Sequence, residues 1–128
     1  MKLLLDTHTL LWVLRDPERL SIAARTALSD PSNQLGVSIA TLWEITIKIG
    51  AGKLILPGSD VMLLAEQLDA FRIELLPILP AHLRTLQQLP LHHRDPFDRM
   101  LIAQAIAESM LLVSVDVQIR QYAVELLW

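Results

Sequence analysis

Short apolar runs alternate with longer helix-like segments along the 128 residues of this chain. Uninterrupted apolar runs bounded by polar or turn residues are typical of strands that are buried on both faces of a parallel sheet. They predict strands at residues 2–6, 35–38, 73–78, 111–115 and 124–127. The segments between them predict helices at residues 7–14, 22–30, 39–49, 61–70 and 97–109, with a shorter helix after Pro80.

Capping and turn residues support these helix boundaries. Ser21 and Ser38 each precede an apolar helical segment, where a serine oxygen can accept from a free backbone N–H. Gly50 follows the 39–49 helix and is a common terminator. Strands that alternate with helices predict a single α/β domain over residues 1–128, a three-layer sandwich with a central parallel sheet flanked by helices.

Four acidic residues interrupt or border otherwise apolar segments. Asp6 and Asp116 each follow a predicted strand, whereas Glu44 and Asp98 lie early in predicted helices. In open parallel sheets, ligands bind beyond the carboxyl ends of the strands, and the following helices begin at that edge. We therefore expect the four carboxylates to converge there. An isolated buried carboxylate is costly, so their convergence predicts a shared divalent cation.

Each acid also has a purely structural explanation. Asp6 and Asp116 can cap the helical segments that follow them, and Glu44 can pair with Lys48 one helical turn later. Asp95, with Pro96 after it, has the typical sequence of a helix start. Capping explains Asp95 well and Asp98 only in part. Taken singly, none of the acids is specific for a metal site.

Composition and charge exclude few classes of protein. The chain is 52% hydrophobic, yet no apolar run approaches the roughly 18–20 residues of a membrane span. The absence of cysteine excludes disulfides and thiolate metal sites, and is consistent with a cytoplasmic protein. A net charge of −3 disfavours a nucleic-acid partner, but divalent cations held by the acids would reverse that sign.

Four motifs occur in an order that resembles PIN-domain proteins, specifically the VapC-like ribonuclease toxins of bacterial toxin–antitoxin pairs. They are LLLDTH at 3–8, SIATLWEI at 38–45, HRDPFDRMLIAQA at 93–105 and LVSVD at 112–116. The block at 94–105 is the most specific, and the resemblance extends from residue 3 to 128. It implies the sheet order 3-2-1-4-5, an RNA substrate, a cognate antitoxin protein and a homodimer.

The resemblance also implies roles for individual residues. In that family the corresponding acids bind magnesium or manganese, so the expected catalytic and metal-binding residues are Asp6, Glu44, Asp98 and Asp116. Carboxylate oxygens suit Mg²⁺ or Mn²⁺, which can support hydrolysis of a phosphodiester. Weaker supporting candidates are Thr7, Ser38, Ser114 and Asp95, the last as a cap or outer-shell residue. Arg94 and Arg99 flank the block and are candidates for contact with RNA phosphate.

Three alternative functions compete with a ribonuclease. A zinc site would use His92 and His93, but adjacent histidines rarely bind one ion, and we expect them in a solvated turn. A phosphoacceptor signalling domain would need a lysine after a late strand, where this chain has none. A degenerate PIN domain that serves only binding or assembly would not need all four acids.

Apolar residues beyond the needs of a core predict a protein interface. The segment 60–71 carries more apolar positions than one core-facing stripe requires. Surplus apolar surface on a small domain marks an interaction site. We also expect Trp12, Trp43 and Trp128 to be core or interface anchors rather than platforms for base stacking. An inhibitory partner would bring an apolar segment and an Arg or Lys to the acidic edge.

Overall fold

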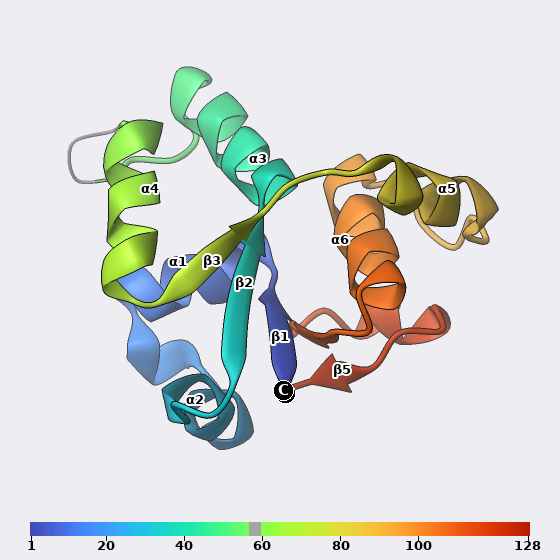
Figure 1. Cartoon of the computed structure of the whole chain (residues 1–128). Helices are drawn as coiled ribbons and strands as arrows, with labels where there is room; N and C mark the ends of the chain where they lie inside the picture. Colours follow the sequence, from blue (N-terminus) through green and yellow to red (C-terminus); the bar gives the residue numbers. More distant parts are fainter. Residues whose placement is uncertain (57–59) are drawn as a thin grey trace.

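A five-stranded parallel sheet forms the centre of the molecule, with the strand order β3-β2-β1-β4-β5 (Figure 1). The computed structural model describes residues 1–56 and 60–128. The strands are β1 (Lys2–Leu5), β2 (Gln34–Ser38), β3 (Ile73–Leu76), β4 (Leu111–Val113) and β5 (Leu126–Leu127). Both the parallel α/β architecture and the expected strand order are confirmed.

In the described residues, six α-helices and two 3₁₀ turns connect the strands. The helices are α1 (Thr7–Arg15), α2 (Ile22–Ser29), α3 (Ile39–Gly50), α4 (Val61–Ala70), α5 (Pro80–Gln88) and α6 (Pro96–Ala107). The 3₁₀ turns are η1 (Pro17–Arg19) and η2 (Val117–Gln121). Ser21 and Ser38 cap α2 and α3 as expected, because their side chains accept from the Ala24 and Ala40 backbone N–H groups. None of the helices in the described residues is long and apolar enough to cross a membrane.

Several elements end earlier than the sequence predicts, β1 and α2 by one residue and three others by two. Strand β3 stops at Leu76 rather than at residue 78, because Pro77 has no N–H to donate to a ladder. Strand β4 stops at Val113 rather than 115; the Ser114 side chain accepts from the Asp116 N–H and turns the chain. Helix α6 stops at Ala107 rather than at residue 109, and Ser109 adopts a left-handed φ of 55°. A non-glycine residue ends this helix, so no glycine marks its end in the sequence.

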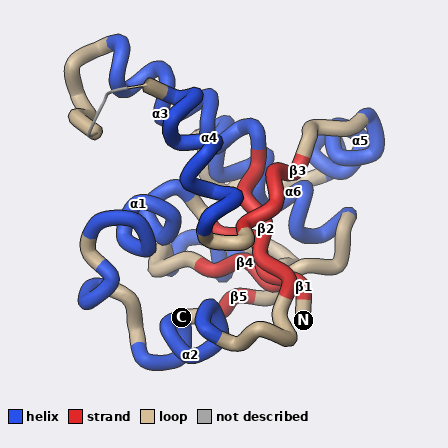
Figure 2. Tube along the Cα trace, turned by 60° about the vertical axis from the view of Figure 1, so that its left-hand side comes forward, coloured by secondary structure: helices blue, strands red, loops and turns tan. Residues whose placement is uncertain are grey.

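Alternate side chains of β1 point to opposite faces of the sheet and define two cores. Leu5 packs with residues of α1, α3 and α4 in one cluster, and Leu3 packs with α2 on the same face. Leu4 points the other way, into a cluster with Leu101 and Ile102 of α6. Figures 1 and 2 show α1 and α2 on one side of the strands and α5 and α6 on the other. The helix–sheet–helix sandwich is confirmed.

We predict that Leu4→Ala lowers the free energy of unfolding by about 2–5 kcal/mol, because Leu4 is fully buried and its loss leaves a cavity between β1 and α6. Urea denaturation followed by circular dichroism measures this loss. Ile22→Ala is the matched control, since Ile22 is 86% exposed and its truncation should change stability little. Equal losses in the two variants would contradict this assignment of the core.

Candidate functional site

The carboxyl edge of the sheet carries the first candidate acid, Asp6, directly after β1. Its backbone N–H donates to the Val113 carbonyl of β4 (3.2 Å), and its Oδ1 accepts from the Thr9 N–H at the start of α1 (2.8 Å). Asp6 is 5% exposed. Two adjacent strands and a helix therefore hold this carboxylate in place. The expected helix-capping role of Asp6 is confirmed, and it uses one of the two carboxylate oxygens.

Glu44 lies on α3, whose first turn begins at the buried Ser38 that ends β2. Its Oε1 accepts from the Thr7 hydroxyl of α1, and its Oε2 pairs with Lys48 Nζ at 2.8 Å. The expected pairing with Lys48 one turn later is therefore present. Thr7 adds a contact that crosses from α1 to α3 and fixes the Glu44 side chain near the edge of the sheet.

The other candidate carboxylates all affect the pKa of Asp98. Its pKa is raised to about 6, first by burial and then by repulsion from Asp95, Glu44, Asp6 and Asp116, in that order. Repulsion of this kind falls off with distance, so a contribution from each of these acids indicates that all four lie within electrostatic range of Asp98. These acids lie at the starts of α1 and η2 and on α3 and near the start of α6, which are far apart in the sequence.

Asp95 and Asp116 act as helix caps in addition to contributing charge. Asp95 is exposed, and its Oδ1 accepts from the N–H groups of Phe97 and Asp98 at 2.9 and 3.0 Å. Asp116 Oδ1 accepts from the Gln118 N–H at 2.9 Å, which caps η2. The buried Ser114 hydroxyl oxygen accepts from the Asp116 N–H at 3.1 Å and so positions this acid.

The acids lie within electrostatic range of Asp98, but in the described part of the chain they do not form a ready-made set of metal ligands. Within residues 1–56 and 60–128, no three Asp, Glu or His side chains lie close enough together to hold one ion. The donor set nevertheless suits a hard divalent cation, because it consists of carboxylate oxygens and the chain has no thiolate. Burial is the largest cause of the raised pKa of Asp98, and a bound cation would offset the repulsion from neighbouring acids that adds to it.

The two candidate arginines differ in their surroundings. The Arg99 guanidinium donates to the Pro90 carbonyl (2.8 Å), the Leu89 carbonyl (3.5 Å) and the Tyr122 hydroxyl (3.1 Å), so it fastens the loop before α6. Arg94 is exposed, and both arginines line a cavity of about 430 Å³ beside the amino end of α6. Arg94 is therefore the more exposed of the two side chains.

The prediction of a solvated turn at the paired histidines is wrong for His93. His92 is exposed, but His93 is half-buried, and its Nδ1 lies 2.7 Å from the Tyr122 hydroxyl. Its Nε2 lies 3.6 Å from Asp98 Oδ2. Tyr122 is a site residue that the sequence analysis missed. It follows His93 by 29 positions, and no local spacing connects the two.

Aromatic residues directly precede two of the acids. Trp43, before Glu44, contacts Phe97, before Asp98, edge to face with ring centroids 5.3 Å apart. Trp43 is 59% exposed, so it is not a core residue, whereas Trp12 and Trp128 pack together at 5.5 Å. The Trp43–Phe97 contact joins α3 to α6 at the point where their acids approach each other.

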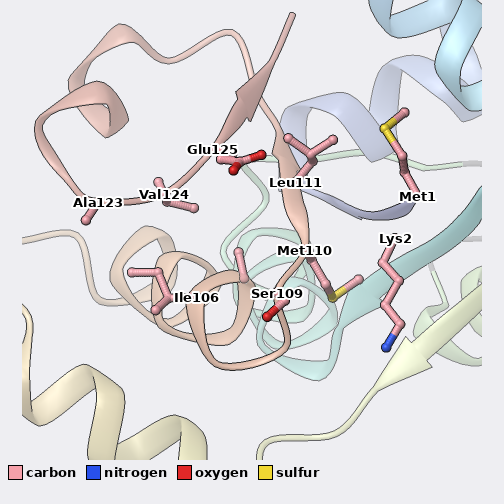
Figure 3. Close-up of a pocket in the computed structure, with 10 residues that line it drawn as sticks. Met1, Lys2, Ile106, Ser109, Met110, Leu111, Ala123, Val124 and Glu125 are labelled. Atoms are coloured by element: carbon pink, nitrogen blue, oxygen red, sulfur yellow. The ribbon is translucent and has the colours of Figure 1, made fainter.

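A separate cavity of about 420 Å³ lies at the opposite, amino edge of the sheet (Figure 3). Met1 and Lys2 line it on one side, and residues 109–111 and 123–125 line it on the other. These segments lie at the starts of β1, β4 and β5, whereas the candidate acids follow the ends of strands. The cavity is therefore not part of the candidate site.

Comparisons with known proteins agree with this architecture. The PIN domain family model matches residues 3–125, nearly the whole chain, and the chain therefore belongs to the PIN domain family. A comparison with curated proteins finds no match in sequence.

Solved structures with this fold include three VapBC structures. VapBC2 from Rickettsia felis, bound to a DNA fragment from its promoter, has a TM-score of 0.73 at 17% identity over 98% of this chain and 97% of its own. DNA-bound VapBC from Salmonella typhimurium (0.69, 18%) and VapBC-1 from nontypeable Haemophilus influenzae (0.68, 16%) each match over 98% of this chain and 96% of theirs. At this identity the likeness shows a shared fold.

We predict that Asp98→Asn raises the melting temperature of the metal-free protein at pH 7.5. The folded-state pKa of Asp98 is about 6, above its ordinary value of 3.8, so folding binds this proton more tightly. The associated stability is present below about pH 4 and is lost as pH rises through 6. Asparagine removes the repulsion, so the gain should shrink on acidification and vanish near pH 4.

Thermal unfolding in chelator between about pH 4 and 8 measures this difference. Asp69→Asn is the matched control, because Asp69 is an exposed acid on α4. A gain for Asp98→Asn that does not depend on pH would show that repulsion among the carboxylates is not its cause.

Proposed function

We propose that this chain is a metal-dependent endoribonuclease that acts in the cytoplasm as the toxin of a toxin–antitoxin pair. One observation carries the proposal: Asp6, Glu44, Asp95 and Asp116 all raise the pKa of Asp98 at the carboxyl edge of a PIN-domain sheet. Carboxylates are gathered against their mutual repulsion where a cation is to be held. The fold likeness to chains solved in VapBC complexes supports the toxin assignment.

In this proposal Asp6, Glu44, Asp98 and Asp116 hold Mg²⁺ or Mn²⁺. The cation would supply activation of water and stabilisation of charge on the phosphodiester during hydrolysis. The protein orients the carboxylates: Thr7 donates to Glu44, and the Ser114 hydroxyl receives the Asp116 N–H. Caps on Asp6 and Asp116 use Oδ1, and a carboxylate has a second oxygen with which to bind an ion.

Supporting residues have lesser roles in this proposal. Ser38 caps α3 and so sets where the helix that carries Glu44 begins. Asp95 caps α6 and adds negative charge close to Asp98. Arg94 is exposed beside the amino end of α6 and is proposed to contact a phosphate of the RNA, whereas Arg99 is committed to the loop before α6.

One observation favours a second candidate function, a PIN domain retained for binding without catalysis. Both oxygens of Glu44 are engaged, one by Thr7 and the other by Lys48. In a catalytic domain a divalent cation would have to displace Lys48 from Oε2. In a binding module this ion pair would simply neutralise Glu44, and the purified protein would not cleave RNA.

We predict that Asp6→Asn, Glu44→Gln, Asp98→Asn and Asp116→Asn each abolish RNA cleavage while the protein stays folded. Metal ligation requires the charge, whereas packing requires mainly the shape. Asp95→Asn should have a milder effect, because asparagine caps helices about as well as aspartate. Cleavage of a labelled single-stranded RNA, with circular dichroism to check folding, measures the effect.

Chelation provides the complementary test. Cleavage should stop in EDTA and return with Mg²⁺ or Mn²⁺, without a requirement for Zn²⁺. Full cleavage in chelator, or activity that survives all four substitutions, would overturn the metal-dependent nuclease. An essential Asp95 with a dispensable Asp98 would instead show that the assignment within the 94–105 block is wrong.

A protein partner is the second part of the proposal. Helix α4 exposes Met62 (66%) and Leu63 (44%) while burying Leu64 and Leu68, so it presents apolar surface beyond its core-facing stripe. We propose that an antitoxin covers apolar surface of this kind and places an Arg or Lys at the acidic edge. A homodimer of the chain is the assembly that the family resemblance implies.

We predict that co-expression with the product of the adjacent gene yields a tight complex without ribonuclease activity. The partner's cation would pair with the carboxylates and compete with the metal. Size-exclusion chromatography and RNA cleavage before and after partner removal measure this. If the chain expressed alone is monomeric, soluble and harmless to its host yet cleaves RNA vigorously in vitro, the antitoxin part is wrong and the nuclease part stands.

A further inference from the structure

The side chain of Tyr122 joins the end of η2 to the loop that precedes α6. The residue is 4% exposed, and its ring belongs to the core cluster of Leu101 and Ile102. Its hydroxyl oxygen lies 3.2 Å from the His92 N, 3.1 Å from the His93 N and 3.1 Å from Arg99 Nη1. The shortest contact of this hydroxyl, 2.7 Å, is with His93 Nδ1.

Counting donors and acceptors assigns the hydroxyl proton. Backbone N–H groups and a guanidinium can only donate, so the Tyr122 oxygen is the acceptor in three of its four contacts. Its single proton remains for His93 Nδ1, which must then be the acceptor. A ring protonated at Nδ1 would instead direct a fourth donor at an oxygen whose two lone pairs are already shared among three donors. The neutral His93 ring therefore carries its proton on Nε2.

The protonated Nε2 of His93 lies on the side of the ring that faces Asp98. It is buried, forms no hydrogen bond within the described part of the chain, and lies 3.6 Å from Asp98 Oδ2. This separation is too long for a hydrogen bond. A small rotation of the half-buried Asp98 carboxylate would bring Oδ2 within reach. Among the described residues this N–H has no other acceptor, so the bond would also satisfy a buried donor.

The His93 ring itself is held in a fixed orientation. Its centroid lies 5.4 Å from that of Tyr122, and Arg99 fastens the same loop through the Leu89 and Pro90 carbonyls. The Arg99 guanidinium carbon also lies 5.9 Å from the centroid of the Tyr122 ring. The histidine is therefore the fixed partner and the carboxylate the movable one.

We propose that Tyr122 and His93 are positioning residues for the Asp98 carboxylate. Tyr122 fixes the tautomer of His93, and His93 Nε2–H donates to Asp98 Oδ2, which leaves Oδ1 to face the other acids. A neutral donor orients the carboxylate without competing with a cation for its charge. Because Asp116 and Tyr122 flank η2, the same contacts hold the two acids of α6 and η2 in register. The proposal rests on the proposed function only in taking Asp98 as a metal ligand.

The first test is spectroscopic and needs neither metal nor RNA. Nitrogen-15 NMR of the full chain in chelator, at about pH 8 where an ordinary imidazole is neutral, reports which ring nitrogen of His93 is protonated. We expect the proton on Nε2 in the wild type and a mixture of tautomers in Tyr122→Phe. Asp98→Asn should shift the His93 Nε2–H resonance, whereas Asp69→Asn should not. A proton on Nδ1, or no shift in Asp98→Asn, overturns the proposal.

The second test measures the affinity for Mn²⁺ alone by calorimetry. His93→Leu should weaken binding by about 10- to 100-fold, the usual effect of losing a group that orients a metal ligand. His93→Gln keeps an N–H donor and should restore most of the affinity. Asp69→Asn, which alters an exposed carboxylate on α4, is the control and should bind like the wild type. Urea denaturation checks that each variant is folded.

The outcomes separate this proposal from the proposed function. Wild-type affinity in His93→Leu, together with loss of binding in Asp98→Asn, would show that Tyr122 and His93 only anchor the loop. No Mn²⁺ binding by the wild type would overturn the metal-dependent nuclease, while the NMR result would still decide whether His93 orients Asp98. If Tyr122→Phe does not fold, the comparison of His93→Leu with His93→Gln carries the test.

Discussion

Repulsion among carboxylates at one edge of a parallel sheet is the constraint on which the candidate site depends. Asp98 is affected most, because it is partly buried and surrounded by acids from other elements, and its pKa rises to about 6. The surrounding contacts hold these charges in place despite that repulsion. Caps on Asp6 and Asp116, the Thr7–Glu44 bond and the Glu44–Lys48 pair each fix one carboxylate.

The fold opposes this repulsion with contacts between distant parts of the chain. The fully buried Thr9 hydroxyl donates to the Val113 carbonyl at 2.9 Å, across 104 positions, and ties α1 to β4. The Asp6 N–H donates to the same carbonyl. Tyr122 ties the end of η2 to the start of α6. These buried bonds are costly to break, so the carboxylates cannot relax by moving apart.

The requirements of a parallel sheet explain why structures with this fold can have low sequence identity to this chain. Chains that are 16–18% identical superpose over nearly their whole length, because a parallel sheet requires apolar runs of the right length and spacing rather than particular residues. The leucines of β1 supply apolar side chains to both faces of the sheet, Leu3 and Leu5 to one and Leu4 to the other. Chemistry at the edge depends on a few polar positions superimposed on that apolar framework.

The amino-acid sequence by itself determined the elements, the helix caps at Ser21, Ser38 and Asp95, and, through the family motifs, the strand order. Local chemistry controls these features, because a cap or an apolar run acts within a few residues. The sequence also predicted which acids would lie at the carboxyl edge of the sheet, because the ends of parallel strands meet there.

Tertiary structure alone decided the remainder. The burial of His93, the role of Tyr122 and the engagement of Glu44 by Thr7 depend on side chains from separate elements. The end of α6 at Ala107, followed by Ser109 in a left-handed conformation without glycine, belongs to the same group. The physical reason is that partners 29 or 37 positions apart meet only once the sheet has brought their elements together.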